Sequence, residues 1–141
     1  MAHVAIVFWS GTGNTEAMAD SVAKGVREAG GTVNLIQAGD FSPADVESYD
    51  AFAFGCPAMG NEILEEDEFE PMYDAVEPAL AGKNVVLFGS YDWGTGEWME
   101  SWEQRATDAG LNVLDSVIAN LDPDGEAQAA CVALGKTIAT A

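Results

Sequence analysis

Basic residues are scarce in this sequence. Five lysines and arginines stand against 24 aspartates and glutamates among 141 residues, which gives a formal net charge of −19. A surface this acidic repels nucleic acid, whose phosphates are bound by lysine and arginine, so we expect no nucleic-acid partner. Two interpretations of the acidity stay open, because it can serve solubility alone or steer the chain toward partners with basic surfaces.

Cysteines and long hydrophobic runs are also few. Cys56 and Cys131 lie in segments that we expect to be a buried strand and a buried helix face, so we predict reduced thiols, no disulfide and no zinc or other metal site. No apolar run approaches the roughly 18 residues of a membrane span. The start lacks the basic region and cleavage site of a signal peptide. These absences predict a cytoplasmic protein that does not contact the membrane.

The sequence does contain a regular alternation of apolar runs and amphipathic stretches. The short apolar runs predict five strands, at residues 4–9, 32–37, 50–56, 84–90 and 112–119. Apolar residues at helical spacing predict helices around 18–26, 69–76 and 98–109, and a last helix from about Glu126. Residues 40–49 are expected to be a connection with a short helical turn.

Strands that are apolar throughout and alternate with helices predict an α/β fold, with a parallel sheet covered on both faces. Right-handed crossovers then make a three-layer α/β/α sandwich, and we expect one domain over residues 1–141. In such folds a ligand lies beyond the carboxyl ends of the strands. The segments that follow the strands there are 10–15, 57–62, 91–96 and 121–125, of which the last has no unusual composition.

The first of these segments reads Ser-Gly-Thr-Gly-Asn-Thr and has no lysine or arginine. Gly11 and Gly13 permit tight turns and a close approach of the backbone to a ligand. The helix that follows adds free N–H groups and the positive end of its dipole. Four side chains of the segment can donate hydrogen bonds: Ser10, Thr12, Asn14 and Thr15. We expect this segment to hold a phosphate with neutral groups; the alternative is a polar turn that binds nothing.

Two nucleotide-binding motifs do not fit this segment. A Walker A loop ends in Gly-Lys-Ser/Thr, and the dinucleotide fingerprint has a third glycine where this chain has Glu16. Phosphoryl transfer would also call for a lysine and Mg²⁺ to neutralise developing charge. The phosphate is therefore expected to anchor a ligand rather than to react.

The second segment is Pro57-Ala58-Met59-Gly60-Asn61-Glu62. Gly60 and Asn61 can form the centre of a turn that exists in two states, with its central peptide flipped. Met59 offers a thioether to a planar ring, and Glu62 offers a carboxylate to a ring N–H. Taken alone, the segment is equally compatible with an ordinary surface turn.

The third segment, together with the end of its strand, reads Ser90-Tyr91-Asp92-Trp93-Gly94-Thr95-Gly96. Trp93 can be a stacking platform for a flat heteroaromatic ring, or a partial lid over the sheet edge. A ligand with a phosphate at one end and a planar ring at the other would touch all three segments, and FMN fits that description. Trp98 and Trp102, four residues apart, are expected to pack in the core instead.

The chain resembles the flavodoxins, and in particular their short-chain type from anaerobic bacteria. Three stretches carry the resemblance, in order along the chain: Ser-Gly-Thr-Gly-Asn-Thr-Glu at 10–16, Gly-Cys-Pro-Ala-Met-Gly at 55–60, and Phe-Gly-Ser-Tyr-Asp-Trp-Gly-Thr-Gly-Glu-Trp-Met at 88–99. No long insertion interrupts the fifth strand, as in the short-chain group. The resemblance implies a sheet of order 2-1-3-4-5 and one non-covalently bound FMN.

The resemblance also implies residue roles. The phosphate would be held by Ser10, Gly11, Thr12, Gly13, Asn14, Thr15 and Ser90. The flavin ring would be lined by Pro57, Ala58, Met59, Gly60, Asn61, Glu62, Tyr91, Asp92, Trp93 and Gly94. Among these, Met59 would line the inner face, Trp93 would stack on the outer face and Glu62 would accept from N3–H. The Gly60 carbonyl would turn toward N5–H after one-electron reduction. Asn61 and Asp92 depart from residues common in the family.

The implied function is that of a low-potential carrier, which moves one electron at a time between the semiquinone and hydroquinone states of FMN. Acidic residues are expected near the flavin, where they disfavour its reduced anion: Glu62, Glu65, Glu66, Asp67, Glu68 and Asp92. The same charges would dock a monomer to basic-surfaced reductases and electron acceptors. The chain would then not be an enzyme and would have no catalytic residues. The alternative is an FMN-dependent NAD(P)H:quinone or nitro reductase of the same fold.

Overall fold

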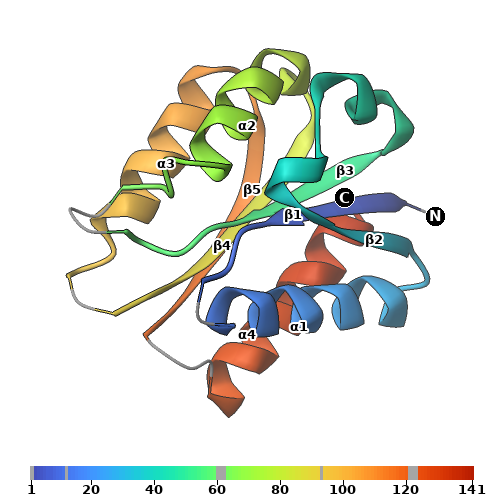
Figure 1. Cartoon of the computed structure of the whole chain (residues 1–141). Helices are drawn as coiled ribbons and strands as arrows, with labels where there is room; N and C mark the ends of the chain where they lie inside the picture. The colour runs from blue at the N-terminus through green and yellow to red at the C-terminus, as the bar shows by residue number, and fades with distance from the viewer. Residues whose placement is uncertain (1, 12, 60–62, 93, 121–123) are drawn as a thin grey trace.

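The core of the molecule is a parallel sheet of five strands. The computed structural model describes residues 2–11, 13–59, 63–92, 94–120 and 124–141. The strands are β1 (His3–Phe8), β2 (Thr32–Gln37), β3 (Ala51–Gly55), β4 (Asn84–Tyr91) and β5 (Asn112–Asn120). They pair in the order β2-β1-β3-β4-β5, all parallel, and Figure 1 shows the resulting twist. The predicted strand order is confirmed.

Helices cover both faces of the sheet (Figure 1). The helices α1 (Asn14–Glu28) and α4 (Gly125–Ala139) lie on one face, and α2 (Phe69–Val76) and α3 (Glu97–Asp108) lie on the other. Short 3₁₀ turns occupy the connections: η1 (Ala38–Asp40), η2 (Pro43–Ser48) and η3 (Glu77–Leu80). The three-layer sandwich is as predicted. No helix in the described ranges combines the length and apolarity needed to cross a bilayer.

The central and edge strands differ in burial. All five residues of β3 are buried, and β1 and β4 are buried along nearly their whole lengths. The edge strands β2 and β5 are mostly half-buried or exposed, and Leu35 and Ile118 keep 38% and 39% of their surface in water. The expectation of a sheet covered on both faces therefore holds for the three central strands. At the edges, four helices are too few to cover both sides.

Strand boundaries lie within one residue of the predicted ones, whereas α1 begins at Asn14, four residues before the apolar spacing that predicted it. Cys56 was expected inside the third strand, but β3 ends at Gly55, and Cys56 is a buried residue just beyond it. The last helix begins at Gly125, because the Asp124 side chain accepts a hydrogen bond from the Ala127 N–H at 2.8 Å and caps it. Because all five strands run in the same direction, the segments after β1, β3, β4 and β5 meet at one edge of the sheet.

Candidate functional site

The segment between β1 and α1 brings a helix N-terminus to the carboxyl edge of the sheet. Gly13 is the N-cap of α1 with a φ of 95°, a left-handed conformation that favours glycine, and its carbonyl accepts the first helical bond from Ala17 N–H. The N–H groups of the first turn therefore point out of the helix end. The Ser10 hydroxyl already accepts from the N–H groups of Gly13 and Glu16, at 3.0 and 3.3 Å. The segment is thus a concentration of neutral donors.

A buried pair of hydroxyls ties this segment to the end of β4. Thr15 Oγ1 lies 2.9 Å from Ser90 Oγ, and the two residues are 1% and 4% exposed. Sequence reasoning placed both residues at a phosphate, in segments 75 positions apart. The structure brings them into contact beside the α1 N-terminus.

In the segment after β3, Met59 and Ile63 form an antiparallel bridge, and we call the predicted turn whose stem they make the Met59–Ile63 turn. Two backbone hydrogen bonds close its stem, from Met59 N–H to Ile63 O at 2.9 Å and from Ile63 N–H to Met59 O at 3.1 Å. Ala58 N–H donates to the Ser90 carbonyl at 2.9 Å, which fixes the start of the turn against β4. Pro57, Ala58 and Met59 are half-buried at this edge. The described stem of the predicted turn therefore lies next to the third segment.

Asn120, at the end of β5, holds the third segment in place. Its side-chain Nδ2 donates to the carbonyls of Tyr91 and Asp92, at 3.2 and 3.1 Å. Tyr91 is half-buried, and Asp92 and Gly94 are exposed at the carboxyl edge of the sheet. Gly94 has a φ of 100°. Because Asn120 binds the carbonyls of Tyr91 and Asp92, the third segment is held in place beside the Met59–Ile63 turn.

Part of the predicted site lies outside the described residues. These positions are Thr12, Gly60, Asn61, Glu62 and Trp93. The phosphate donor at 12, the centre of the turn and the stacking platform therefore stay predictions. The remaining residues expected at the site lie in three segments at the carboxyl edge of β1, β3 and β4.

The comparison with known proteins agrees with this arrangement. The flavodoxin family model matches residues 6–135. The flavodoxin of Megasphaera elsdenii is 47% identical over 138 residues, which are 98% of this chain and 99% of that protein. The flavodoxin of Clostridium beijerinckii is 46% identical over 135 residues, 95% of this chain and 97% of that protein.

Solved structures give the same result. The solution structure of two-electron reduced Megasphaera elsdenii flavodoxin superposes with a TM-score of 0.91 at 47% identity, covering 98% of this chain and 99% of that one. The chain belongs to the flavodoxin family. It is accordingly an FMN-binding electron-transfer protein, and the resemblance seen in the sequence is confirmed. An archaeal flavodoxin, at 26% identity, superposes with a TM-score of 0.88 over 98% of this chain and 96% of that one.

The described residues fit the FMN that the flavodoxin family binds. A Cβ at Gly13 would meet no atom within 4 Å, so the mouth of the α1 N-terminus is open to a phosphate. The buried Thr15–Ser90 pair lies beside this helix N-terminus. The Met59–Ile63 turn and the Tyr91–Asp92 backbone then offer two walls for a ring. Among the described residues, no group of three or more His, Cys, Asp or Glu could hold a metal ion.

Three further residues support the flavodoxin site and escaped sequence reasoning. Trp98 is 2% exposed, as packing predicted, but its Nε1–H also donates to the Cys56 carbonyl at 3.3 Å, which joins the second and third segments. Asn120 was overlooked because the segment after β5 has no unusual composition. Glu65 was counted only as a surface charge, whereas its side chain is buried. The contacts of Trp98 and Asn120 depend on segments distant in the sequence, whereas the donors to the Glu65 side chain lie two to four positions after it.

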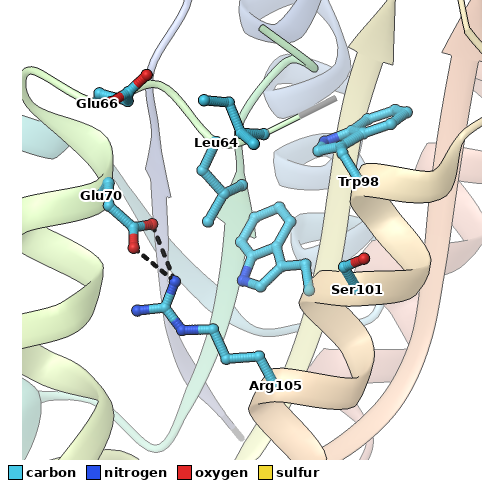
Figure 2. A pocket seen from close by; sticks show the side chains of 8 residues that line it. Leu64, Glu66, Glu70, Trp98, Ser101 and Arg105 are labelled. Atoms are coloured by element: carbon cyan, nitrogen blue, oxygen red, sulfur yellow. Dashed lines mark hydrogen bonds and ion pairs between the residues drawn. The ribbon is translucent and has the colours of Figure 1, made fainter. Parts of the chain in front are cut away.

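A cavity of about 360 Å³ opens on the α3 side of the Met59–Ile63 turn. Its lining is Ile63, Leu64, Glu66, Glu70, Trp98, Ser101, Trp102 and Arg105. Figure 2 shows Leu64 and Trp98 at one end and the Arg105–Glu70 ion pair at the other. The cavity thus combines an apolar end near the Met59–Ile63 turn with a charged end toward α2.

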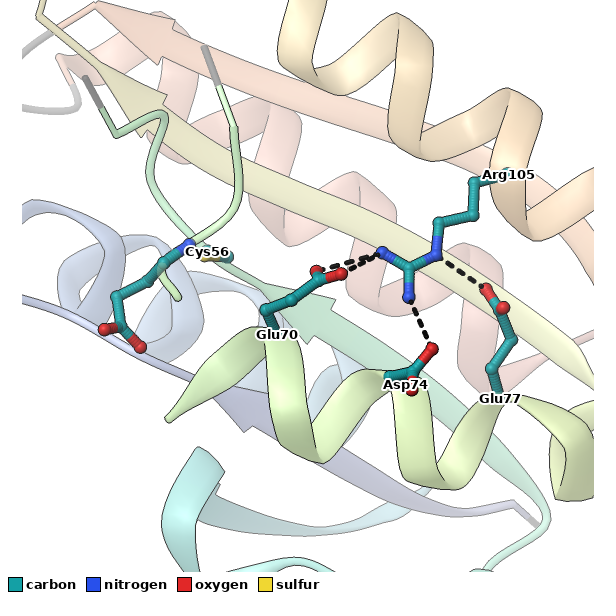
Figure 3. A network of polar contacts seen from close by, with 6 residues as sticks. Cys56, Glu70, Asp74, Glu77 and Arg105 are labelled. Carbon is teal, nitrogen blue, oxygen red and sulfur yellow. Dashed lines mark hydrogen bonds and ion pairs between the residues drawn. The ribbon is translucent and has the colours of Figure 1, made fainter. Parts of the chain in front are cut away.

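Arg105, the basic residue of this cavity, is already bound by three carboxylates (Figure 3). Its guanidinium donates from Nη1 to both Glu70 oxygens, at 2.8 and 2.9 Å, and from Nη2 to Asp74 at 3.4 Å. Its Nε lies 3.6 Å from Glu77 Oε2. Burial alone would lower the pKa of Arg105, but the hydrogen bond and charge of Glu70, with Glu77, raise it. The cluster therefore carries net negative charge despite the arginine.

Proposed function

We propose that the protein carries single electrons between redox proteins, on a non-covalently bound FMN held at low potential, and is not itself an enzyme. When bound, FMN supplies the chemistry of accepting and donating electrons one at a time. The role of this chain's residues is to bind the cofactor, orient it and set its electrostatic surroundings. Support comes from membership of the flavodoxin family and from the positions of the charged residues.

The observation that carries the low potential is the position of the five basic residues. Lys83 precedes β4, and Arg27 is in the last turn of α1, both toward the amino edge of the sheet. Lys24 and Lys136 pair with Glu28, at 4.0 and 3.4 Å. Arg105 is bound by its own three carboxylates. No lysine or arginine of the sequence therefore remains to neutralise a phosphate or a reduced flavin at the carboxyl edge.

The proposed phosphate site consists of Ser10, Gly11, Thr12, Gly13, Asn14, Thr15 and Ser90. Its support is the helix N-terminus after Gly13 and the buried Thr15–Ser90 contact. The proposed ring site consists of Pro57, Ala58, Met59, Gly60, Asn61, Glu62, Tyr91, Asp92, Trp93 and Gly94. Its support is the closed stem of the Met59–Ile63 turn and the Asn120 bonds to the neighbouring segment.

We further propose that the partners are reductases and electron acceptors with basic surfaces, and that the chain acts as a cytoplasmic monomer of one domain. The net charge of −19 and the surplus of carboxylates around Arg105 favour such partners. Association with these partners should then be steered electrostatically, and its rate should fall as the salt concentration rises.

Anaerobic reduction of the FMN-loaded protein tests this proposal. We expect one FMN per chain and two separated one-electron steps, the second below that of free FMN. A single exposed charge about 10 Å away contributes roughly 0.4 kcal/mol through water, or about 20 mV. Glu66→Gln, beside the turn, should therefore raise the second potential by about that amount, whereas Glu47→Gln, which lies before β3 at the amino edge, should change it less.

The reductase alternative has its own test. The loaded protein is mixed with NADH or NADPH and a quinone or nitro compound, without a separate reductase. An electron carrier turns over slowly here, because it has to receive its electrons from another protein. Fast turnover would contradict the carrier function, and a protein that does not take up FMN would contradict both.

A further inference from the structure

Glu65 is a buried carboxylate beside the Met59–Ile63 turn, and its partners are backbone N–H groups. The residue is 4% exposed. Its Oε2 accepts from the Asp67 N–H at 2.7 Å, and its Oε1 accepts from the N–H groups of Glu68 and Phe69, at 2.7 and 2.8 Å. Among the described residues, no basic side chain forms an ion pair with it.

These contacts keep Glu65 ionised at the start of α2. Burial alone would raise the pKa of Glu65, but the three backbone N–H donors outweigh it and lower the pKa. Of the three donors, Phe69 is the first residue of α2, where a helix leaves its N–H groups unpaired, and Asp67 and Glu68 lie in the turn just before it. The positive end of the helix dipole also favours an anion there. The side chain therefore fixes how the chain enters α2.

The backbone of Glu65 is hydrogen-bonded both to Cys56, after β3, and to Glu70, in α2. Its N–H donates to Cys56 Sγ at 3.3 Å, and its carbonyl accepts from Glu70 N–H at 2.8 Å. Cys56 is fully buried just after β3, and burial raises the pKa of its thiol, so the sulfur stays protonated. Glu65 thus connects the residue before the turn to the helix after it.

The described residues between these two anchors hold the ends of the turn. Ala58 is bound to the Ser90 carbonyl, Met59 and Ile63 form the stem, and Leu64, 8% exposed, packs in the core. The Cys56 side chain closes the base of the loop by accepting from the Glu65 N–H. The Glu65 backbone thus ties the stem to the end of β3, and the Glu65 side chain ties it to the start of α2.

We propose that Glu65 is a positioning residue, which clamps the base of the Met59–Ile63 turn between β3 and α2 so that the turn is held ready for FMN. The inference rests on the proposed function, because it assumes that the turn contacts the flavin. The clamp sets the geometry of the stem, whereas the neighbouring acidic residues act through their charge alone.

Glu65→Gln and Glu66→Gln make a matched pair, since each removes one negative charge at adjacent positions and Glu66 is exposed. Glutamine at 65 keeps one acceptor oxygen but turns an NH₂ group toward a backbone donor, so it breaks part of the clamp. In the FMN-free protein, we expect faster amide exchange at Asp67, Glu68 and Phe69 in Glu65→Gln. The FMN dissociation constant should rise about tenfold in Glu65→Gln and less than about twofold in Glu66→Gln.

The midpoint potentials separate positioning from charge and from general stability. A lost charge mainly raises the second potential, at which the flavin becomes an anion, and both variants share this shift. A loosened turn should in addition lower the first potential, and only in Glu65→Gln. Equal FMN affinities and equal first potentials for the two variants would overturn the clamp.

Variants of Cys56 test the same clamp without a change of charge, also if Glu65→Gln does not fold. Cys56→Ala removes the acceptor of the Glu65 N–H and should weaken FMN binding. Cys56→Ser keeps an acceptor and should stay closer to the parent. If the two variants bind FMN equally well and as tightly as the parent, the inference fails. If the parent itself does not bind FMN, the proposed function fails with it.

Discussion

At the scale of single residues, the site depends on buried polar contacts between distant segments. Thr15 and Ser90 satisfy each other's hydroxyls in a place that water hardly reaches. Thr15→Val or Ser90→Ala leaves one buried hydroxyl unpaired, which costs about 1–3 kcal/mol of unfolding free energy. The double variant should cost less than the sum of the two, because no hydroxyl is then left unpaired. Urea unfolding of the FMN-free protein measures all three.

Thr137 offers a matched control for this pair. It is exposed on α4, and its hydroxyl donates to the Ala133 carbonyl within the same helix. Thr137→Val should change the unfolding free energy by no more than about 0.5 kcal/mol. If the loss of unfolding free energy in the double variant equalled the sum of the losses in Thr15→Val and Ser90→Ala, the two hydroxyls would not be coupled.

Glu65 also makes stability depend on pH. Its pKa is lowered in the folded protein, so its stabilising effect is complete above the unfolded value and is lost as pH falls through the folded one. The difference in unfolding free energy between the parent and Glu65→Gln should therefore be largest at neutral pH. It should shrink below about pH 4.3, the ordinary value for a glutamate. A difference that stays constant down to acid pH would contradict an ionised clamp.

At the scale of elements, the two helices on one face of the sheet pack through glycines. A Cβ at Gly25 in α1 would clash with the Val132 carbonyl, and one at Gly135 in α4 would clash with the Val22 carbonyl. Gly135→Ala should therefore lose about 1–3 kcal/mol by overpacking, although alanine favours a helix by about 1 kcal/mol. Thermal or urea unfolding measures the loss.

Gly125, in the first turn of the same helix, is the control for this substitution. A Cβ there would meet no atom within 4 Å. Gly125→Ala should be neutral or stabilising by about 0.4–1 kcal/mol, since it restricts the unfolded chain. If both alanine variants behaved alike, the close crossing of α1 and α4 would be contradicted.

The burial of helices and strands was predicted from sequence patterns with different success. The helix face of Phe69, Met72, Tyr73 and Val76 is buried as predicted, because apolar spacing within one helix is a local property. The edge strands β2 and β5 are less buried than predicted, because their place in the sheet is decided by other strands. Cys56 lies beyond β3, since the chain turns there toward the loop.

At the scale of the whole molecule, the net charge of −19 should oppose the compact state. Added NaCl screens this repulsion, because the Debye length falls from about 30 Å at 0.01 M to about 10 Å at 0.1 M. We expect the midpoint of thermal unfolding of the FMN-free protein to rise by roughly 4 °C for each 1 kcal/mol recovered. Plotted against ionic strength, the unfolding midpoint should follow the same curve in NaCl and in KCl. A midpoint that does not change with ionic strength would contradict the repulsion.

The sequence by itself determined what is local: the alternation of strands and helices, the glycine turn before α1, and the three segments in which a phosphate and a flat ring were expected. Each depends on spacing or on residue types within about ten positions. The tertiary structure decided which distant groups meet. Sheet order brings Thr15 to Ser90, and Asn120 to the carbonyls of Tyr91 and Asp92.

Glu65 is an intermediate case: its hydrogen-bond partners lie within nine positions of it, yet the sequence presents it as one more acidic residue among its neighbours. Its burial follows from the end of β3 and the start of α2 meeting beside it, where backbone N–H groups and a thiol surround it. A pattern of charges along the chain cannot tell a solvated carboxylate from a buried one. That difference depends on which backbone donors the fold brings to the side chain.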